Sequence, residues 1–418
     1  MYYSFKYLHT SKIIWAVVSA ICLFLGLFGK ENAITFVGVI PLSLYFFSNA
    51  SIKKIVTSTI PLLAAFVIWF IIRWRVLGFA TTSGTEVIDL MNNPFAGMQV
   101  GEKFATIIYT LGVYVKLLFF PHPLTHDYYP YHIPIMQWGN WQVLLSVLLY
   151  VALGIVALLG LRKKNVFAYA ILFYIFTLSI TSNLPFTVGT FMNERFVYIS
   201  SIGLCIALAY LMHNKFPAWF KQPIGRYIGI ALFALYAIGF SAKTWLRVPA
   251  WENAFSLNSA AIKVSKNSAR ANTFMGTALF KQYQKETDNA KKEELINKVA
   301  YHIDRSLSIH PKYGSALTMK SGVVAEQYKY HKDIDQLLNG FYDVLTLKIN
   351  VDYIDTYMDY LNGGRAPTDK LVAWYNRVGN MMIDRHQRRD YAAKFFKKGL
   401  EIEPSNIDLK RGLARAGG

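Results

Sequence analysis

The feature that most constrains this chain is a series of long apolar segments in its first 250 residues. An α-helix needs about 20 mostly apolar residues to cross the hydrocarbon core of a bilayer. Seven segments meet this description, and an eighth, Phe104–Phe120, is apolar but interrupted by Lys116. The others are apolar on every side, unlike the striped helices of a soluble core, and aromatic and basic residues flank them. The seven clear candidates are Ile13–Phe28, Ala33–Phe47, Ile55–Ile72, Trp141–Leu161, Ala168–Asn183, Phe196–Leu211 and Tyr227–Ala242.

The charge distribution divides the chain into two parts. Residues 1–250 contain six acids and eighteen Lys or Arg, whereas residues 251–418 contain nineteen acids and twenty-six bases. The sequence therefore predicts an all-α protein, with a multi-pass membrane domain over 1–250 and a soluble helical domain over 251–418. The net charge of +19 would suit nucleic acid. However, many bases of the first part lie beside apolar segments and anchor helices at a membrane surface, so no nucleic-acid partner is predicted.

The basic clusters also predict an orientation, because cytoplasmic loops are rich in Lys and Arg. Lys53-Lys54, Arg162–Lys164, the bases between 215 and 226 and the N-terminal lysines share one side only if Phe104–Phe120 does not cross fully. If it does cross, Lys53-Lys54 moves outside and the loop 79–103 moves inside. The acids of that loop favour the first arrangement; they are Glu86, Asp89 and Glu102. Both arrangements place residues 251–418 outside the cytoplasm.

The second part shows repeat character. Three strings align with a helix end, a turn and a helix start, and their turn residues Lys266, Pro311 and Pro404 are spaced by 45 and 93. The pattern resembles a degenerate tetratricopeptide repeat. We expect Gly276, Gly322 and Gly379 to let paired helices pack closely. The aligned strings are AIKVSKNSARA (261–271), SLSIHPKYGSA (306–316) and GLEIEPSNIDL (399–409).

Ionisable residues are so rare in the membrane part that each is a candidate for function. Glu31 follows Lys30 in a short turn between two apolar segments. It is either an ordinary interfacial loop residue or a polar group that lines a cavity filled by water or headgroups. The pair Glu194-Arg195 enters a segment that otherwise lacks acids. Arg195 could hold a phosphate with its planar fork of donors; the alternative is a local ion pair with Glu194.

The third candidate is the loop 121–134, PHPLTHDYYPYHIP, which contains Asp127 and His126. Together with His122 and His132 these residues suggest a metal, but the spacing does not place them on one helix face. We therefore predict no metal site and an aromatic loop of the kind that stacks on sugar rings. The chain contains no phosphate-binding glycine loop, zinc-binding or nucleophile motif. Cys22 and Cys205 lie in apolar segments, which argues against a disulfide framework.

Three strings in order, GKENAITFVGVIPLSLYFF (29–47), KLLFFPHPLTHDYYPYHIP (116–134) and SNLPFTVGTFMNERFVYISSIG (182–203), precede the repeats. With them the chain resembles the transmembrane-and-TPR protein O-mannosyltransferases and their bacterial relatives, in the GT-C superfamily. The resemblance implies a polyprenyl-phosphate-linked sugar as donor, with no further cofactor, and transfer to protein Ser or Thr hydroxyls. It implies a bacterial cytoplasmic membrane as the location, with the repeats on the periplasmic side binding an acceptor or partner protein.

One departure from that family bears on activity. GT-C enzymes carry a catalytic acid, often in a pair, in their first external loop, whereas the loop Gly29–Asn32 has no acidic pair. We therefore expect the family's first helices and catalytic loop to be missing, and a partial glycosyltransferase to remain. The resemblance places Glu31 and Lys30 near the donor, Asp127 and His126 at the external mouth and Glu194-Arg195 near the phosphate. Asp127 and Glu194 are the candidate catalytic acids. The alternatives are a non-catalytic membrane scaffold whose repeats bind envelope proteins and, third, a transporter.

Overall fold

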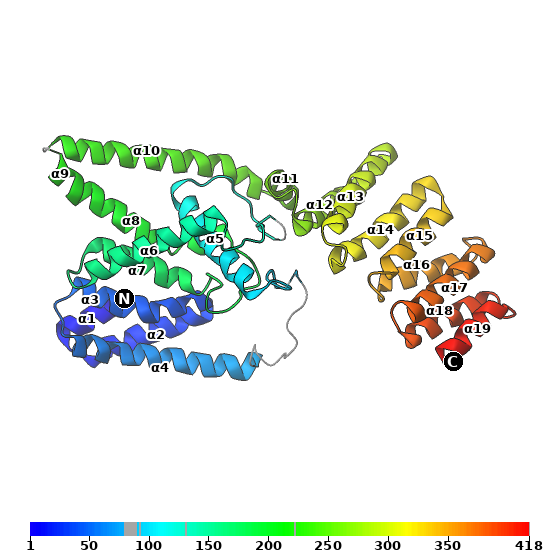
Figure 1. Ribbon diagram of the computed structural model, residues 1–418, viewed down its shortest axis with the longest axis horizontal. Coiled ribbons are helices and arrows are strands. Elements are labelled where there is room, and N and C mark those ends of the chain that lie inside the picture. The colour runs from blue at the N-terminus through cyan, green and yellow to red at the C-terminus, as the bar shows by residue number, and fades with distance from the viewer. Residues whose placement is uncertain (79–89, 92, 130–131, 221–222, 418) are drawn as a thin grey trace. The chain divides into compact units, whose positions relative to one another are not determined.

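A computed structural model of the chain describes residues 1–417 except 79–89, 92, 130–131 and 221–222 (Figure 1). Within these residues the secondary structure is helical and contains no strand, which confirms the predicted all-α class. Contacts divide the chain into a membrane unit, residues 1–128 and 133–249, and a C-terminal unit, residues 129–132 and 250–418. Glu86, Asp89 and Lys221, which entered the orientation argument, lie outside the described residues.

Three helices of the membrane unit are long and apolar enough to cross a bilayer: α4 (Ile52–Leu77), α6 (Trp141–Leu161) and α10 (Ile224–Arg247) with its continuation to Trp251. Shorter apolar helices accompany them. The unit also contains α1 (Tyr2–Thr10), α2 (Ile13–Gly29), η1 (Glu31–Thr35), α3 (Phe36–Phe47), α5 (Val100–Phe119), α7 (Val166–Ser179), η2 (Glu194–Val197), α8 (Ser201–Tyr210), η3 (Leu211–Lys215) and α9 (Phe216–Trp219). The chain is therefore an integral membrane protein.

Many apolar side chains on these long helices are exposed at the surface of the protein, which is unfavourable in water. On α6, Leu148 and Leu158 are 66% and 72% exposed within the protein, and most of the helix is not covered by neighbours. An apolar surface of this extent marks contact with another phase. Hydrocarbon provides that phase, because every backbone polar group inside a helix is already hydrogen-bonded.

Two predicted segments end differently in the structure. The segment predicted over Ala168–Asn183 is α7, which stops at Ser179, and residues 180–193 form an irregular loop. Asn183 holds this loop: its amide nitrogen donates to the carbonyls of residues 190 and 191 at 2.9 and 3.0 Å, and its oxygen accepts from the amide of residue 188 at 2.9 Å. Its φ of 63° is left-handed, a conformation that Asn tolerates better than most residues.

The segment predicted over Phe196–Leu211 also starts late. Its first residues belong to η2, and the α-helix α8 begins only at Ser201. Asn193 caps η2 by accepting from the amide of Arg195 at 3.2 Å. The predicted stretch Phe104–Phe120 corresponds to α5, which ends at Phe119. Because α5 contains the charged residues Glu102, Lys103 and Lys116, it is not among the three helices that are apolar enough to cross a bilayer.

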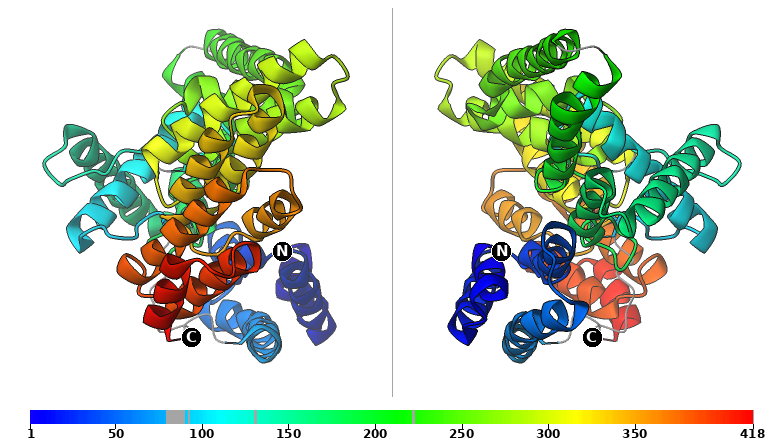
Figure 2. Two further views of the ribbon diagram at one scale, coloured as in Figure 1. Left: turned by 90° about the vertical axis from the view of Figure 1, so that its right-hand side faces the viewer. Right: turned by 90° about the vertical axis from the view of Figure 1, so that its left-hand side faces the viewer.

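The C-terminal unit is a series of helices, most of which pack against the one before them; α16 packs against α14, and α17 against α15 (Figures 1 and 2). Its core contains Trp374, whose indole donates to the carbonyl of Leu338 at 2.7 Å, and the fully buried Phe396. Asp333 caps α15 by accepting from two backbone amides, both at 3.0 Å. The helices are α11 (Ala254–Val264), α12 (Ala269–Lys285), α13 (Asn289–Ile309), α14 (Gly314–His331), α15 (Ile334–Leu345), α16 (Asp352–Asn362), α17 (Thr368–Asp384), α18 (Arg389–Ile402) and α19 (Ile407–Ala416).

The three aligned strings each form the predicted helix end, turn and helix start, at the α11/α12, α13/α14 and α18/α19 junctions. The prediction for the glycines is confirmed at two of three positions. A methyl group added at Gly276 would meet Ile303 at 2.9 Å, and one at Gly379 would meet Phe396 at 2.5 Å. At Gly322 nothing lies within 4 Å, so the prediction was wrong there: this glycine does not face a neighbouring helix.

Candidate functional site

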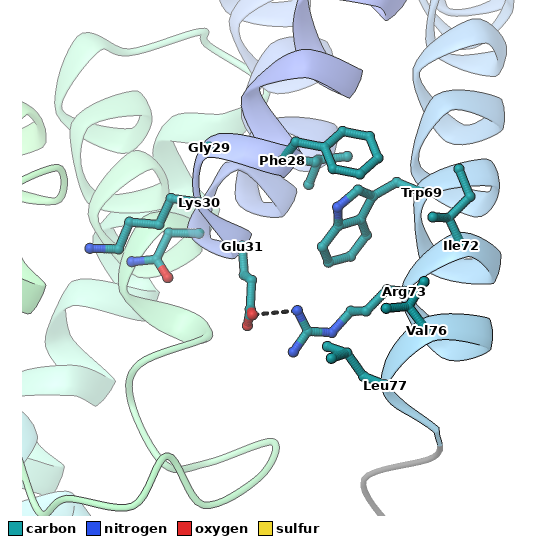
Figure 3. Close-up of a pocket in the computed structure, with 11 residues that line it drawn as sticks. Phe28, Gly29, Lys30, Glu31, Trp69, Ile72, Arg73, Val76 and Leu77 are labelled. Carbon is teal, nitrogen blue, oxygen red and sulfur yellow. Dashed lines mark hydrogen bonds and ion pairs between the residues drawn. The ribbon is translucent and has the colours of Figure 1, made fainter.

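The first candidate site is a pocket of about 500 Å³ in the membrane unit. It opens where α2 ends and the turn 29–32 leads into η1, beside the last turns of α4 (Figure 3). Its lining combines apolar, aromatic and charged side chains. The lining residues are Leu27, Phe28, Gly29, Lys30, Glu31, Asn32, Trp69, Ile72, Arg73, Val76 and Leu77.

An ion pair between Glu31 and Arg73 forms the polar part of this pocket (Figure 3). The two side chains are 59% and 37% exposed. The Arg73 guanidinium also lies 5.5 Å from the centre of the Trp69 ring, within the range of a cation–π contact. Lys30 points to the other side of the turn in Figure 3. The turn thus presents Glu31 to α4 and directs the Lys30 ammonium elsewhere.

Sequence reasoning chose Glu31 but missed Arg73. It ended the apolar segment at Ile72, one residue before the partner. The available signal was physical: an acid at a membrane boundary is costly unless a base pairs with it, and Arg73 and Arg75 are the bases at the end of that segment.

The second site surrounds Glu194, which we call the Glu194 cluster and define as Glu194, Thr125, Tyr128, His122, Lys243 and Arg247. Asn193, the residue before Glu194, holds this cluster in place by hydrogen bonds. The backbone amide of Asn193 donates to the Tyr114 hydroxyl of α5 at 3.0 Å, and its side chain donates to the carbonyl of His126 at 3.3 Å. These bonds fix η2 against both α5 and the loop that follows it.

One oxygen of the Glu194 carboxylate accepts two hydrogen bonds from that loop. The backbone amide of Thr125 donates at 2.6 Å and the Tyr128 hydroxyl at 2.8 Å. The alternative of a local ion pair between Glu194 and Arg195 is therefore wrong: among the described residues, the carboxylate bonds to the 125–128 loop. Arg195 is exposed, with its guanidinium 5.8 Å from the centre of the Phe196 ring.

Burial raises the pKa of the Glu194 carboxyl above its usual range. The bonds from Tyr128 and Thr125 and the charges of Arg247 and Lys243 oppose this rise. Burial, together with the neighbouring carboxylate, also raises the pKa of the Tyr128 hydroxyl. A carboxyl with a raised pKa is a stronger base than an ordinary carboxylate, and catalytic sites often contain such groups. Glu194, one of the two predicted catalytic candidates, is placed in this way.

Asp127 and His126 lie in the same loop as Thr125 and Tyr128, the two residues that donate to the Glu194 carboxylate. Asp127 is 1% exposed, and its backbone amide donates to the Thr125 hydroxyl at 3.4 Å. The contact between His126 and Asn193 uses the backbone carbonyl of the histidine. Nowhere in the described part of the chain do three His, Cys, Asp or Glu side chains gather as a metal site requires.

The basic members of the Glu194 cluster were missed from the sequence. Lys243 and Arg247 lie in the last turns of α10, and the Lys243 ammonium is 3.3 Å from Nδ1 of His122. The signal was their spacing: two bases four residues apart lie on one face of a helix. That face meets the Glu194 loop only in the folded protein.

Comparison with models of protein families gives no match. Among curated proteins, the chain is 24% identical over 360 residues to human "Protein O-mannosyl-transferase TMTC3", covering 79% of this chain and 38% of that protein. It is 28% identical over 223 residues to mouse "Protein O-mannosyl-transferase TMTC1", covering 51% of this chain and 22% of that protein. The chain thus spans well under half the length of the relatives it matches. They are distant homologues, and they support a likeness to the TMTC proteins.

Proposed function

We propose that this chain acts in a GT-C-type membrane glycosyltransferase reaction that moves a mannose-like sugar from a polyprenyl phosphate to Ser or Thr hydroxyls of proteins. The names of the distant relatives support O-mannosyl transfer. The observation that carries the proposal is Glu194, a half-buried carboxyl that accepts hydrogen bonds from Thr125 and Tyr128 and that lies within the influence of the charges of Arg247 and Lys243. Attack by a hydroxyl requires a base, and the departing phosphate requires positive charge.

The residues of the two candidate sites, and Arg195, have separate roles in this proposal. Glu194 takes the proton from the acceptor hydroxyl, and Tyr128 holds the carboxylate in place. Arg195 is exposed and free to meet the donor or the acceptor. The Glu31–Arg73 pocket, with Lys30 at its edge, offers charged donors and the Trp69 ring to a sugar.

The test is transfer by the purified 418-residue chain in lipid, supplied with a polyprenyl-phosphate mannose and an acceptor peptide. Glu194→Gln keeps the shape of the side chain and removes the base, and we expect it to lower kcat by about 10²–10⁴-fold. Asp127→Asn is the matched control, because it changes the other candidate acid of the same region. A rate unchanged in Glu194→Gln and lost in Asp127→Asn would transfer the role of base to Asp127.

A second function, a scaffold without catalysis, is favoured by one observation. The turn Gly29–Asn32 holds a single acid, and Glu31 is paired with Arg73. Under this alternative the chain shows no turnover with any polyprenyl-phosphate sugar, and the C-terminal unit alone accounts for binding to envelope proteins.

We further propose that the C-terminal unit lies on the external side of the membrane, where an acceptor protein would meet it. The positions of the basic loops around α6 and α7 support this orientation. A reporter that is active only in the cytoplasm, fused after Gly418, should give no signal. A strong signal would overturn the orientation and leave the proposed chemistry to be tested separately.

A further inference from the structure

The last turns of α10 carry two cations whose partners are few. Arg247 has a buried guanidinium nitrogen, Nη2, for which the described part of the chain provides no hydrogen-bond partner. Lys243 contacts His122 at 3.3 Å, and a ring nitrogen carries no full negative charge to balance an ammonium. A buried donor without a partner is costly. The end of α10 is therefore complete only when an acceptor is supplied.

Two contacts establish which face of α10 these cations occupy. The Tyr236 hydroxyl donates to the carbonyl of Leu118 at 3.0 Å, and Lys243 reaches His122. Seven residues on α10 make nearly two turns, so both side chains lie on one face. That face lies along the end of α5 and the segment after it, and Arg247 follows four residues further on the same face.

Glu194 does not fill the role of the missing acceptor. Its carboxylate is the nearby acid of the cluster, and one of its oxygens already accepts from Thr125 and Tyr128. The structure gives no ion pair between Glu194 and either cation among the described residues. The charges of Arg247 and Lys243 are nevertheless close enough to act on the carboxyl. An anion placed between these cations would be balanced by both of them.

An apolar cavity of about 230 Å³ is lined in part by Leu118, a residue that also contacts α10. Leu118 connects the two: its backbone carbonyl binds Tyr236 of α10, and it lines the cavity. Four residues after Leu118 comes His122, the partner of Lys243. The cavity lies among α5, α6, α7 and α8, and its lining is Val115, Leu118, Phe119, Leu153, Phe167, Ala170, Ile171, Tyr174, Gly203, Leu204 and Ala207.

The place of the cations along the membrane helix fits an amphiphile. Both cations lie near the end of the apolar span Ile224–Trp251. Trp245, which lies between them in the sequence, is 82% exposed. Exposed Trp side chains at the end of a membrane helix sit at the level of the headgroups. A phosphate belongs at that depth, and its hydrocarbon chain belongs in the apolar region beside it.

We infer that Lys243 and Arg247 bind the phosphate of a polyisoprenyl lipid phosphate, whose hydrocarbon chain runs past Leu118 into the apolar cavity. Arg247 offers two parallel donors to phosphate oxygens, and Lys243 adds a compact charge. This assignment rests on the proposed function for the identity of the lipid. It replaces Arg195, to which the sequence assigned the phosphate, with two bases from a distant helix.

Binding is the direct test, with the full-length chain in nanodiscs of phosphatidylcholine and a photoreactive long-chain polyprenyl monophosphate as the probe. We expect Lys243→Gln and Arg247→Gln each to weaken binding about tenfold, which corresponds to about 1.4 kcal/mol. Lys243→Arg keeps the charge and should bind as the parent does, whereas Arg247→Lys loses the paired donors and should bind more weakly than the parent but more tightly than Arg247→Gln. Arg226→Gln, an exposed base at the other end of α10, is the matched control and should change nothing.

Competition against the same probe identifies the ligand. The polyprenol without its phosphate should fail to compete, and inorganic phosphate should compete only weakly. Equal competition by phosphatidylglycerol would assign the site to a membrane headgroup and overturn the polyisoprenyl assignment. Loss of binding in Arg195→Gln with none in Lys243→Gln/Arg247→Gln would overturn the location.

The same preparations separate this inference from the proposed function. Binding that depends on Lys243 and Arg247, without sugar transfer, would support the inference and count against the enzyme. If the Lys243→Gln/Arg247→Gln variant still transfers sugar and still binds the probe fully, the result would support the enzyme and contradict the inference. Retained helical circular dichroism and a single peak in size-exclusion chromatography establish that each variant is folded.

Discussion

The membrane unit and the C-terminal unit both carry more bases than acids, but they balance this charge by different means. In the C-terminal unit, bases pair with aspartates of other helices and so connect neighbouring helices. Such pairs are Lys320–Asp304, Lys370–Asp335, Lys394–Asp355, Lys398–Asp359 and Arg415–Asp384. In the described part of the membrane unit, the corresponding pair is Arg73–Glu31.

Other bases of the membrane unit use backbone carbonyls. The Lys54 ammonium donates to the carbonyl of Leu8 at 2.7 Å, and that of Lys164 to the carbonyl of Ser48 at 2.6 Å. These lysines lie at helix ends, where unpaired carbonyls and lipid phosphates are both within reach. The difference teaches that the surroundings of a charge decide its partner: bases of the C-terminal unit meet aspartates of other helices, whereas Lys54 and Lys164 of the membrane unit meet backbone carbonyls.

The largest effect should come from the core of the C-terminal unit. Phe396 is fully buried, and a methyl group added at Gly379 or Gly412 would touch its ring. We expect Phe396→Ala to destabilise this unit by about 3–5 kcal/mol, because the cavity cannot collapse completely. Hydrogen–deuterium exchange of peptides from α17 to α19 in the full-length protein measures it. Tyr301→Ala, at an exposed aromatic, should change exchange by less than about 0.5 kcal/mol.

Two side chains of equal exposure, one in each unit, should respond differently to replacement by arginine. Leu148 on α6 and Tyr301 on α13 are both 66% exposed. Leu148→Arg should oppose membrane insertion of α6 by about 2.5–3.5 kcal/mol, measured with a glycosylation reporter of insertion. Tyr301→Arg should leave hydrogen exchange in α13 unchanged, since water surrounds it. Tolerance of the arginine at Leu148 would mean that this face does not meet lipid.

The third prediction compares two glutamates by their protonation. Burial raises the pKa of Glu194, whereas hydrogen bonds from the amides of Asp288 and Thr287 lower the pKa of exposed Glu286. A raised pKa keeps a larger fraction protonated at a given pH, and a carbodiimide reacts with the protonated acid. Above the ordinary value of 4.5, Glu194 should be modified and Glu286 should not, as followed by mass spectrometry. Labelling of Glu194 should vanish as the pH rises through its folded pKa.

Tyr128→Phe sharpens this comparison. The Tyr128 hydroxyl donates to the carboxylate and so lowers the pKa of Glu194. Without it, labelling should persist to higher pH. Tyr114→Phe, which removes a hydroxyl that bonds to Asn193, is the control. Equal pH profiles in all variants would contradict a direct role for Tyr128.

The smallest effect should come from the ion pairs that distinguish the C-terminal unit. The Lys394–Asp355 pair is partly exposed, at 39% and 23%. A double-mutant cycle with Lys394→Gln and Asp355→Asn should give a coupling of about 0.2–1 kcal/mol that weakens with added salt. Exchange of α16 and α18 peptides measures it. A coupling that salt does not reduce would indicate a desolvated pair.

The sequence by itself determined the all-α class of this protein. Apolar segments such as Trp141–Leu161 and the turns at Pro311 and Pro404 are local features, so they predict helices and their ends without knowledge of the fold. The helix ends around Asn183 could not be predicted in this way, because an asparagine side chain there replaces backbone bonds that a helix would make.

Only the tertiary structure decided which charged groups meet. Glu31 finds Arg73 across 42 residues, Glu194 finds Tyr128 across 66, and Lys243 finds His122 across 121. Hydropathy and turn chemistry carry no information about such pairs. They depend on which faces of α4, α5 and α10 turn toward one another, and helix packing fixes those faces only when the whole unit has folded.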